Sequence, residues 1–137
     1  MAPVILASAS PRRAELLRAA AIPFDVRPAD VDESVRAGEM AERYVRRVAA
    51  DKARAIASRH PDAIVLAADT TVVVDAEILA KPVDSDDARR MLRRLSGRSH
   101  EVLTGVCIAH PGGEEAQVAS TTVTFAPLTD AEIAWYV

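Results

Sequence analysis

The stretch SASPRR, residues 8–13, combines two serine hydroxyls with two guanidinium groups at a predicted helix start. Pro11 is typical of the first helical position, and a serine before it is a favourable N-cap. Arg12 and Arg13 then fall in the first turn, where the helix dipole disfavours each cation by about 0.3–1 kcal/mol. A bound phosphate removes this conflict, because it accepts hydrogen bonds from backbone N–H groups, hydroxyls and guanidinium groups together. Ser8, Ser10 and the two arginines therefore predict an anion site.

Asp69 directly follows the apolar run AIVLAA and precedes Thr70. A carboxylate at the end of an apolar strand is partly desolvated, which raises its pKa and suits it to general-base chemistry or metal binding. An aspartate in this position can equally cap a turn or a helix together with Thr70. The local pattern leaves both interpretations open.

Two lysines have unusual surroundings. Lys52 falls within the apolar stripe of a predicted helix, where an unpaired ammonium group is costly, so it must extend to water or meet an anion. Lys81 follows the apolar run EILA, and Pro82 favours an extended backbone that projects the lysine away from the strand end. Each lysine is a candidate ligand for an anion, and each can also be a solvated side chain.

Asp32 and Glu33 are adjacent carboxylates in the polar segment of residues 29–39. Hard cations such as Mg²⁺ and Mn²⁺ are held by one or two carboxylates together with waters and substrate phosphates. The pair is therefore a candidate metal site, with an ordinary solvated loop as the alternative.

The elements that must position these side chains alternate between strand and helix in the first half of the chain. Predicted strands cover residues 3–7, 24–28 and 63–68, extended structure covers 70–80 with a turn near 75–76, and a long hairpin surrounds 111–113. Predicted helices cover residues 11–20, 40–59 and 85–95, and a last helix begins at a capping box of Thr129 and Glu132. This order favours an α/β fold with a mixed β-sheet and flanking helices. Polar residues that follow parallel strands gather at one edge of such a sheet, which is where ligands bind.

Composition limits the class of protein. The 137 residues are half apolar, which suits one folded domain, and a net charge of −3 argues against a general nucleic-acid binder. A single cysteine, Cys107, excludes an internal disulfide, fits a reducing cytoplasm and is expected in the core. We expect neither a signal peptide nor a membrane span. The sequence also lacks the P-loop, GxGxxG, HExxH and GxSxG patterns.

Several motifs in order resemble the Maf family of nucleotide pyrophosphatases, from about residue 4 to residue 137. LASASPRRAELL resembles the family's opening signature, VDES its acidic loop and YVRRVAADKARA the helix that carries its lysine. The segment from AADTTVVVD to HEVLTGV resembles the central block of the family. The resemblance implies a fold similar to that of inosine triphosphate pyrophosphatases, with two lobes around a cleft, in a protein that is commonly a homodimer.

The resemblance also implies hydrolysis of a nucleoside triphosphate to the monophosphate and pyrophosphate with Mg²⁺ or Mn²⁺. Asp69 would accept the proton of the attacking water and Glu33 would help to hold the metal, while Lys52 and Lys81 would contact the triphosphate. Ser8, Arg12 and Arg13 would bind it as well. Arg12 and Thr70 also match the subfamily that prefers dTTP, UTP and modified pyrimidine nucleotides.

The chain departs from the family pattern in two places. Ala76 and Ala80 stand where glycines are usual, and the family continues past the last helix into a segment that contributes to base recognition. We therefore expect residues 1–137 to be a single Maf-like domain that is truncated at its C-terminal end. Two alternatives stay open: a catalytically impaired nucleotide-binding regulator linked to septum formation and cell division, and a phosphohydrolase acting on a phosphomonoester.

Overall fold

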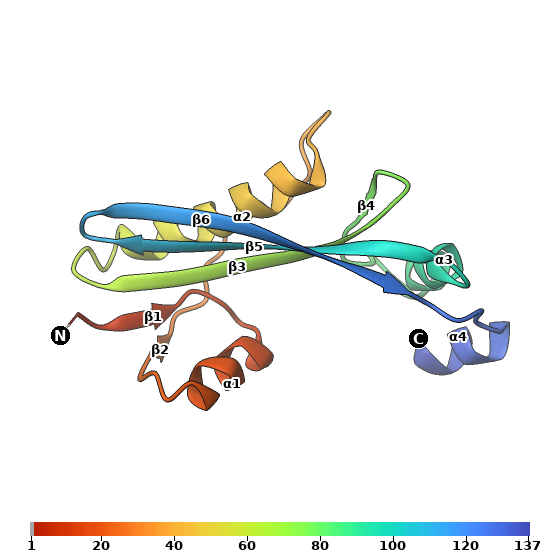
Figure 1. Ribbon diagram of the computed structural model, residues 1–137, viewed down its shortest axis with the longest axis horizontal. Coiled ribbons are helices and arrows are strands. Elements are labelled where there is room, and N and C mark those ends of the chain that lie inside the picture. The colour runs from red at the N-terminus through yellow and green to blue at the C-terminus, as the bar shows by residue number, and fades with distance from the viewer. Residues whose placement is uncertain (1) are drawn as a thin grey trace. The chain divides into compact units, whose positions relative to one another are not determined.

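The computed structural model describes residues 2–137, in which strands and helices alternate up to β3 (Ile64–Val74) and two pairs of consecutive strands follow (Figure 1). The strands are β1 (Val4–Leu6), β2 (Asp25–Val26), β3 (Ile64–Val74), β4 (Glu77–Leu79), β5 (Ser99–His110) and β6 (Gly113–Thr124). The helices are α1 (Pro11–Ala19), α2 (Ala41–Ala57), α3 (Ser85–Leu95) and α4 (Asp130–Tyr136). The predicted α/β class is confirmed.

The strands form one six-stranded sheet in the order β2-β1-β3-β5-β6, with β4 paired to β3 outside this path. β1 is parallel to both of its neighbours, and Ile5 aligns with Asp25 on β2 and with Val65 on β3. β4 is antiparallel to β3. The predicted mixed sheet is therefore confirmed. The parallel pairing of β1 with β3 ends at Leu6 and Leu66.

The chain divides into two compact units. The first comprises residues 2–69 and 104–119, and the second comprises residues 70–103 and 120–137. The boundaries between them fall within β3, β5 and β6. No helix within residues 2–137 is long and apolar enough to cross a membrane.

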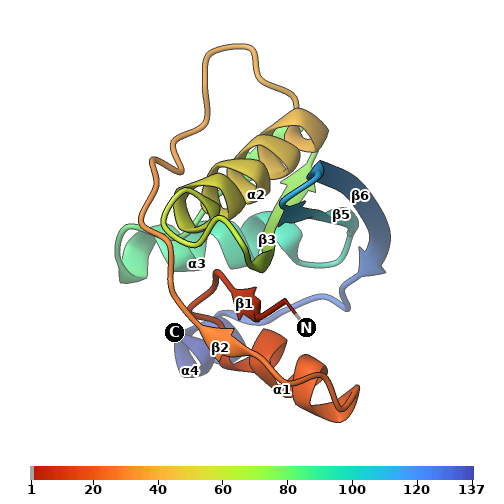
Figure 2. The same cartoon turned by 90° about the vertical axis from the view of Figure 1, so that its left-hand side faces the viewer.

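In the first unit α2 packs its apolar face on the sheet, and α1 lies on the other side of β1 (Figure 2). Cys107 is fully buried in this core, as predicted. Gly105 is what lets α2 approach β5, because a Cβ atom at this position would lie only 2.4 Å from the carbonyl oxygen of Val45. The helix that carries Lys52 is thus fixed directly against the sheet.

In the second unit α3 packs on the β3–β4 hairpin through Leu95, which is buried beside Val74 and Leu79. The turn of this hairpin is at Asp75-Ala76, as predicted, and both residues have positive φ angles, 50° and 62°. The capping box at the start of α4 is confirmed.

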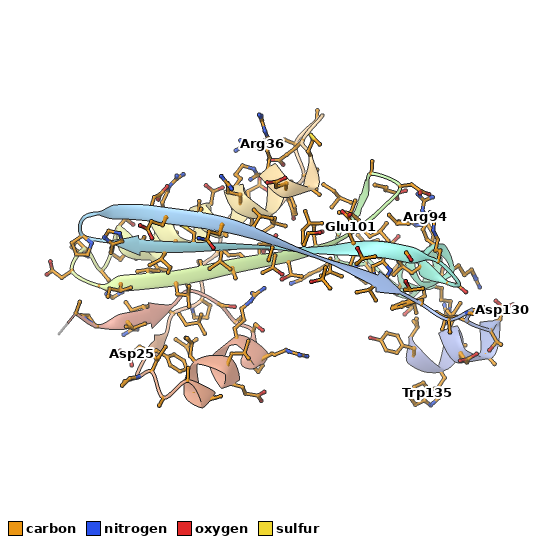
Figure 3. All side chains as sticks on the ribbon, viewed as in Figure 1. Asp25, Arg36, Arg94, Glu101, Asp130 and Trp135 are labelled. Atoms are coloured by element: carbon orange, nitrogen blue, oxygen red, sulfur yellow. The ribbon has the colours of Figure 1, made fainter. Side chains whose placement is uncertain are left out.

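α4 buries Ile133 and exposes the aromatic residues that follow it. Ile133 is only 2% exposed, whereas Trp135 is 86% exposed and its side chain points away from the rest of the second unit (Figure 3).

Three local predictions were inaccurate. β3 does not end at residue 68 but continues through Asp69 to Val74, because residues 72–74 gain backbone pairing with β4. The strand predicted over residues 24–28 is reduced to Asp25–Val26. Ser10 occupies the N-cap position of α1, but its side chain accepts no capping hydrogen bond.

Candidate active site

Lys52 of α2 lies between two carboxylates in the first unit. Its Nζ is 3.4 Å from Oδ1 of Asp69 and 3.2 Å from Oε1 of Glu33. The Lys52 side chain is only 12% exposed, so its ammonium group is largely removed from bulk water. The structure therefore resolves the ambiguity in the sequence: this lysine meets anions, and they belong to its own chain.

Asp69 lies inside β3 and is nearly buried, with a side chain that is 10% exposed. The residues on both sides of it are extended, so the alternative in which it caps a turn or a helix is wrong. Burial raises its pKa above the ordinary value, and the neighbouring Lys52 only partly opposes this effect. Its second oxygen, Oδ2, is buried without a hydrogen-bond partner among residues 2–137. This oxygen is available to accept a proton or to bind a cation.

Ser8 and Arg13 meet just after β1. Ser8 is buried, and its Oγ accepts hydrogen bonds from the Ser10 N–H at 3.1 Å and from Nη1 of Arg13 at 3.2 Å. The Arg13 charge also lowers the pKa of Asp69, which places the guanidinium group within electrostatic reach of that carboxylate. Arg12 is exposed on the first turn of α1.

Strand pairing explains why these groups come together. The Ala7 N–H donates to the Leu66 carbonyl at 2.9 Å, so the chain leaves β1 beside the segment that leads to Asp69. Ser8 therefore follows β1 next to the part of β3 that leads to Asp69, although Asp69 lies inside its strand and not at the strand end that the sequence predicts. Ligands bind at this kind of position in α/β sheets.

Thr70 and Lys81 belong to the second unit. Thr70 follows Asp69 on β3 and is exposed, and Lys81 is exposed two residues after β4 ends at Leu79. Lys81 and Pro82 belong to neither a helix nor a strand, so the extended backbone expected at Lys81 stays a prediction. The part that Thr70 and Lys81 play in the site stays a prediction.

Sequence reasoning missed two residues of α2 that hold the acidic loop, residues 29–39. The hydroxyl of Tyr44 donates to the carbonyl oxygen of Glu33 at 2.7 Å, and Arg47 donates to the carbonyl oxygen of Ser34 at 2.9 Å. Tyr44 lies one turn before Val48 on the buried face, so it has the signature of a core residue. Its polar end gives no signal in the sequence, because its partner is a backbone atom.

The fit to a metal can be tested on the carboxylates. No group of three or more His, Cys, Asp or Glu side chains within residues 2–137 is arranged to hold a metal ion. Glu33 and Asp69 nevertheless share one neighbour, Lys52, and Oδ2 of Asp69 is an unpaired buried oxygen. Two oxygen donors suit a cation such as Mg²⁺ that takes its other ligands from waters and substrate phosphates.

The architecture corresponds to a class of solved structures. One is the nucleoside-triphosphatase / dITP/XTP pyrophosphatase of Mycobacterium abscessus, at 19% identity with a TM-score of 0.55 over 88% of this chain and 71% of that chain. Another is the Staphylococcus aureus Ham1 protein, at 18% identity with a TM-score of 0.59 over 88% of this chain and 69% of that chain. At such identities the likeness establishes the fold alone, and the predicted similarity in fold to pyrophosphatases of this class is confirmed.

Sequence comparison defines the family. The model of the Maf-like proteins matches residues 3–137, and the chain belongs to this family. The dTTP/UTP pyrophosphatase of Myxococcus xanthus is 56% identical over 97% of this chain and 67% of the relative. The dTTP/UTP pyrophosphatase of Anaeromyxobacter dehalogenans is 56% identical over the whole of this chain and 71% of the relative.

Proposed function

We propose that this protein hydrolyses nucleoside triphosphates, with dTTP and UTP as preferred substrates, to the monophosphate and pyrophosphate. One observation carries the proposal: a desolvated carboxylate, Asp69, lies beside the largely buried side chain of Lys52 and next to a serine-arginine pair at a helix start. The names of the relatives at 56% identity support the same reaction and the same pyrimidine substrates.

In this reaction Asp69 is the general base. Its carboxylate accepts a proton from the water that attacks phosphorus, the α–β anhydride bond breaks, and pyrophosphate leaves. A raised pKa makes the carboxylate a stronger base than an ordinary aspartate. Phosphoryl chemistry otherwise needs positioning and neutralisation of charge, and Lys52, whose Nζ is 3.4 Å from Oδ1 of Asp69, would supply positive charge to the phosphates.

The remaining predicted residues would bind the substrate. Ser8, Ser10, Arg12 and Arg13 provide hydroxyls, guanidinium groups and the positive end of a helix for the triphosphate. Arg12 also bears on the choice of base, as does Thr70. Lys81 would add a second ammonium group to the triphosphate site.

We further propose that a divalent cation, Mg²⁺ or Mn²⁺, takes part in the reaction. Glu33 and Asp69 would hold it, because they are the two carboxylates that flank Lys52. When bound, the cation supplies positive charge that neutralises the phosphates. A single Maf-like domain over residues 1–137, a homodimer and a cytoplasmic location also remain proposals.

The test is a screen of common and modified nucleoside triphosphates with Mg²⁺ or Mn²⁺, scored separately for pyrophosphate and orthophosphate. We expect pyrophosphate as the first product, with dTTP and UTP among the best substrates. Binding of UTP without release of pyrophosphate would instead identify a regulator. Orthophosphate as the first product would identify a phosphomonoesterase.

A further inference from the structure

The acidic loop has no regular secondary structure, yet two side chains of α2 fix its backbone. Tyr44 is 5% exposed, and its hydroxyl donates to the Glu33 carbonyl at 2.7 Å. Nη2 of Arg47 donates to the next carbonyl, that of Ser34, at 2.9 Å. Two successive peptide groups are therefore attached to a helix that itself packs on the sheet.

Arg47 also holds the end of the same loop. Its Nε and Nη2 donate to the two carboxylate oxygens of Glu39 at 2.7 and 2.9 Å, in a bidentate pair. This pairing lowers the pKa of Glu39 to about 2. Glu39 in turn accepts the backbone N–H of Arg36, which lies on the loop beside α2 (Figure 3).

The two holding side chains also contact each other. The Arg47 guanidinium lies over the Tyr44 ring at 5.6 Å from its centroid, in a cation–π contact. They are three residues apart on the helix, so they project from neighbouring positions on one face. Tyr44, Arg47 and Glu39 therefore form one connected group of contacts.

The functional consequence concerns Glu33. Its carboxylate reaches Lys52 at 3.2 Å from a loop position where the side chain is 45% exposed. The carbonyl that Tyr44 binds belongs to this same residue, so loss of that bond frees the backbone that presents the carboxylate. We propose that Tyr44, supported by Arg47, is a positioning residue that fixes Glu33 beside Lys52 for binding of the cation and nucleotide. This inference rests on the proposed function of the site.

The first test compares two identical chemical changes, because the chain contains two tyrosines. Tyr44→Phe keeps the buried ring and removes only the hydroxyl, whereas Tyr136→Phe does the same at a residue that is 74% exposed. Mn²⁺ binding is followed by electron paramagnetic resonance with α,β-methylene-UTP present. We expect Tyr44→Phe to weaken Mn²⁺ binding by about three- to ten-fold, the effect of one lost hydrogen bond, and Tyr136→Phe to leave it unchanged.

The second test is a double-mutant cycle with Glu33→Gln. If Tyr44 acts through Glu33, Tyr44→Phe has no further effect on Mn²⁺ binding once the carboxylate has been removed. Hydrogen exchange of residues 33–39 provides a readout that needs neither metal nor turnover, and it should accelerate in Tyr44→Phe alone. Equal exchange in both tyrosine variants, or an effect of Tyr44→Phe that persists in Glu33→Gln, would overturn the proposal.

The outcomes separate this inference from the proposed function. If wild-type protein binds Mn²⁺ and the analogue but releases no pyrophosphate from UTP, the proposed hydrolase activity is wrong. The double-mutant cycle then still decides whether Tyr44 positions Glu33. Wild-type protein that hydrolyses UTP while Tyr44→Phe binds Mn²⁺ normally defeats only the positioning role. Absence of Mn²⁺ binding by wild-type protein overturns the inference about the cation.

Discussion

Replacing Asp69 by asparagine tests the central assignment with almost no change in shape. Asparagine retains an oxygen at the position of Oδ1, which accepts from Lys52 at 3.4 Å, but it has no basic group. A positioned general base contributes about 10²- to 10⁴-fold to a rate, so we expect kcat for release of pyrophosphate from UTP to fall by about that factor. Nucleotide binding should persist, because the groups around Ser8 and Arg13 are unchanged.

The same variant should be more stable than the wild type above neutral pH. Burial raises the pKa of Asp69, so folding disfavours its ionised form. Protonated Asp69 contributes its full stability below pH 3.8, the ordinary pKa of an aspartate. This contribution is lost as the pH rises through the raised pKa of the folded protein. The asparagine side chain carries no charge at any pH, so Asp69→Asn should raise the free energy of unfolding at pH 8, and the gain should disappear below pH 3.8.

Asp87→Asn is the matched control, because it makes the same change where the shift has the opposite sign. Hydrogen bonds from the Val83 N–H and from Arg90 lower the pKa of Asp87, so its stabilising effect is present above 3.8. It should therefore lose stability at pH 8, measured by urea unfolding. If Asp69→Asn releases pyrophosphate at the rate of the wild-type protein, Asp69 is not the general base. If Asp69→Asn is less stable than the wild-type protein at pH 8, the argument from burial is wrong.

Three further changes test the frame and the electrostatics. Gly105→Ala should lower the free energy of unfolding by about 1–3 kcal/mol in urea titrations, because the new Cβ meets the α2 backbone. Gly112→Ala is the control and should lower it less, because its new Cβ meets only a side chain. Ala76→Gly should raise it by about 0.5–1 kcal/mol, because glycine relieves a positive φ, and Ala80→Gly should not raise it. Lys52→Met removes a charge that lowers the pKa of Asp69, so with Asp69 as the proposed general base, the acidic limb of the pH–rate profile should move to higher pH.

Local signals made several elements predictable. α3 occupies Ser85–Leu95 as expected, because Asp84 caps its first turn through the Asp87 N–H and Gly97 follows its end with a φ of 65°. The course of β3 was not predictable in the same way. A polar residue after an apolar run resembles a strand end, but backbone pairing with β4 extends the strand beyond Asp69.

Part of the site was also predictable from the sequence. Lys52 is conspicuous in the sequence because an ammonium group within an apolar stripe needs an anion. The sequence could not show that Glu33 is one of the carboxylates beside Lys52, because the position of an irregular loop depends on long-range contacts. Those contacts are made by Tyr44 and Arg47, whose partners include backbone carbonyls that no side-chain pattern reveals.

The charges in the first unit favour a cation–nucleotide complex over a free phosphate. The first turn of α1, which lies entirely within the described residues, contains no acidic side chain, so its arginines and helix dipole present positive charge. Beside Lys52, two carboxyl groups, those of Glu33 and Asp69, face one ammonium group. A free phosphate complements only the first of these groups. A nucleoside triphosphate with a bound divalent cation complements both, since its phosphates suit the helix start and its cation suits Glu33 and Asp69.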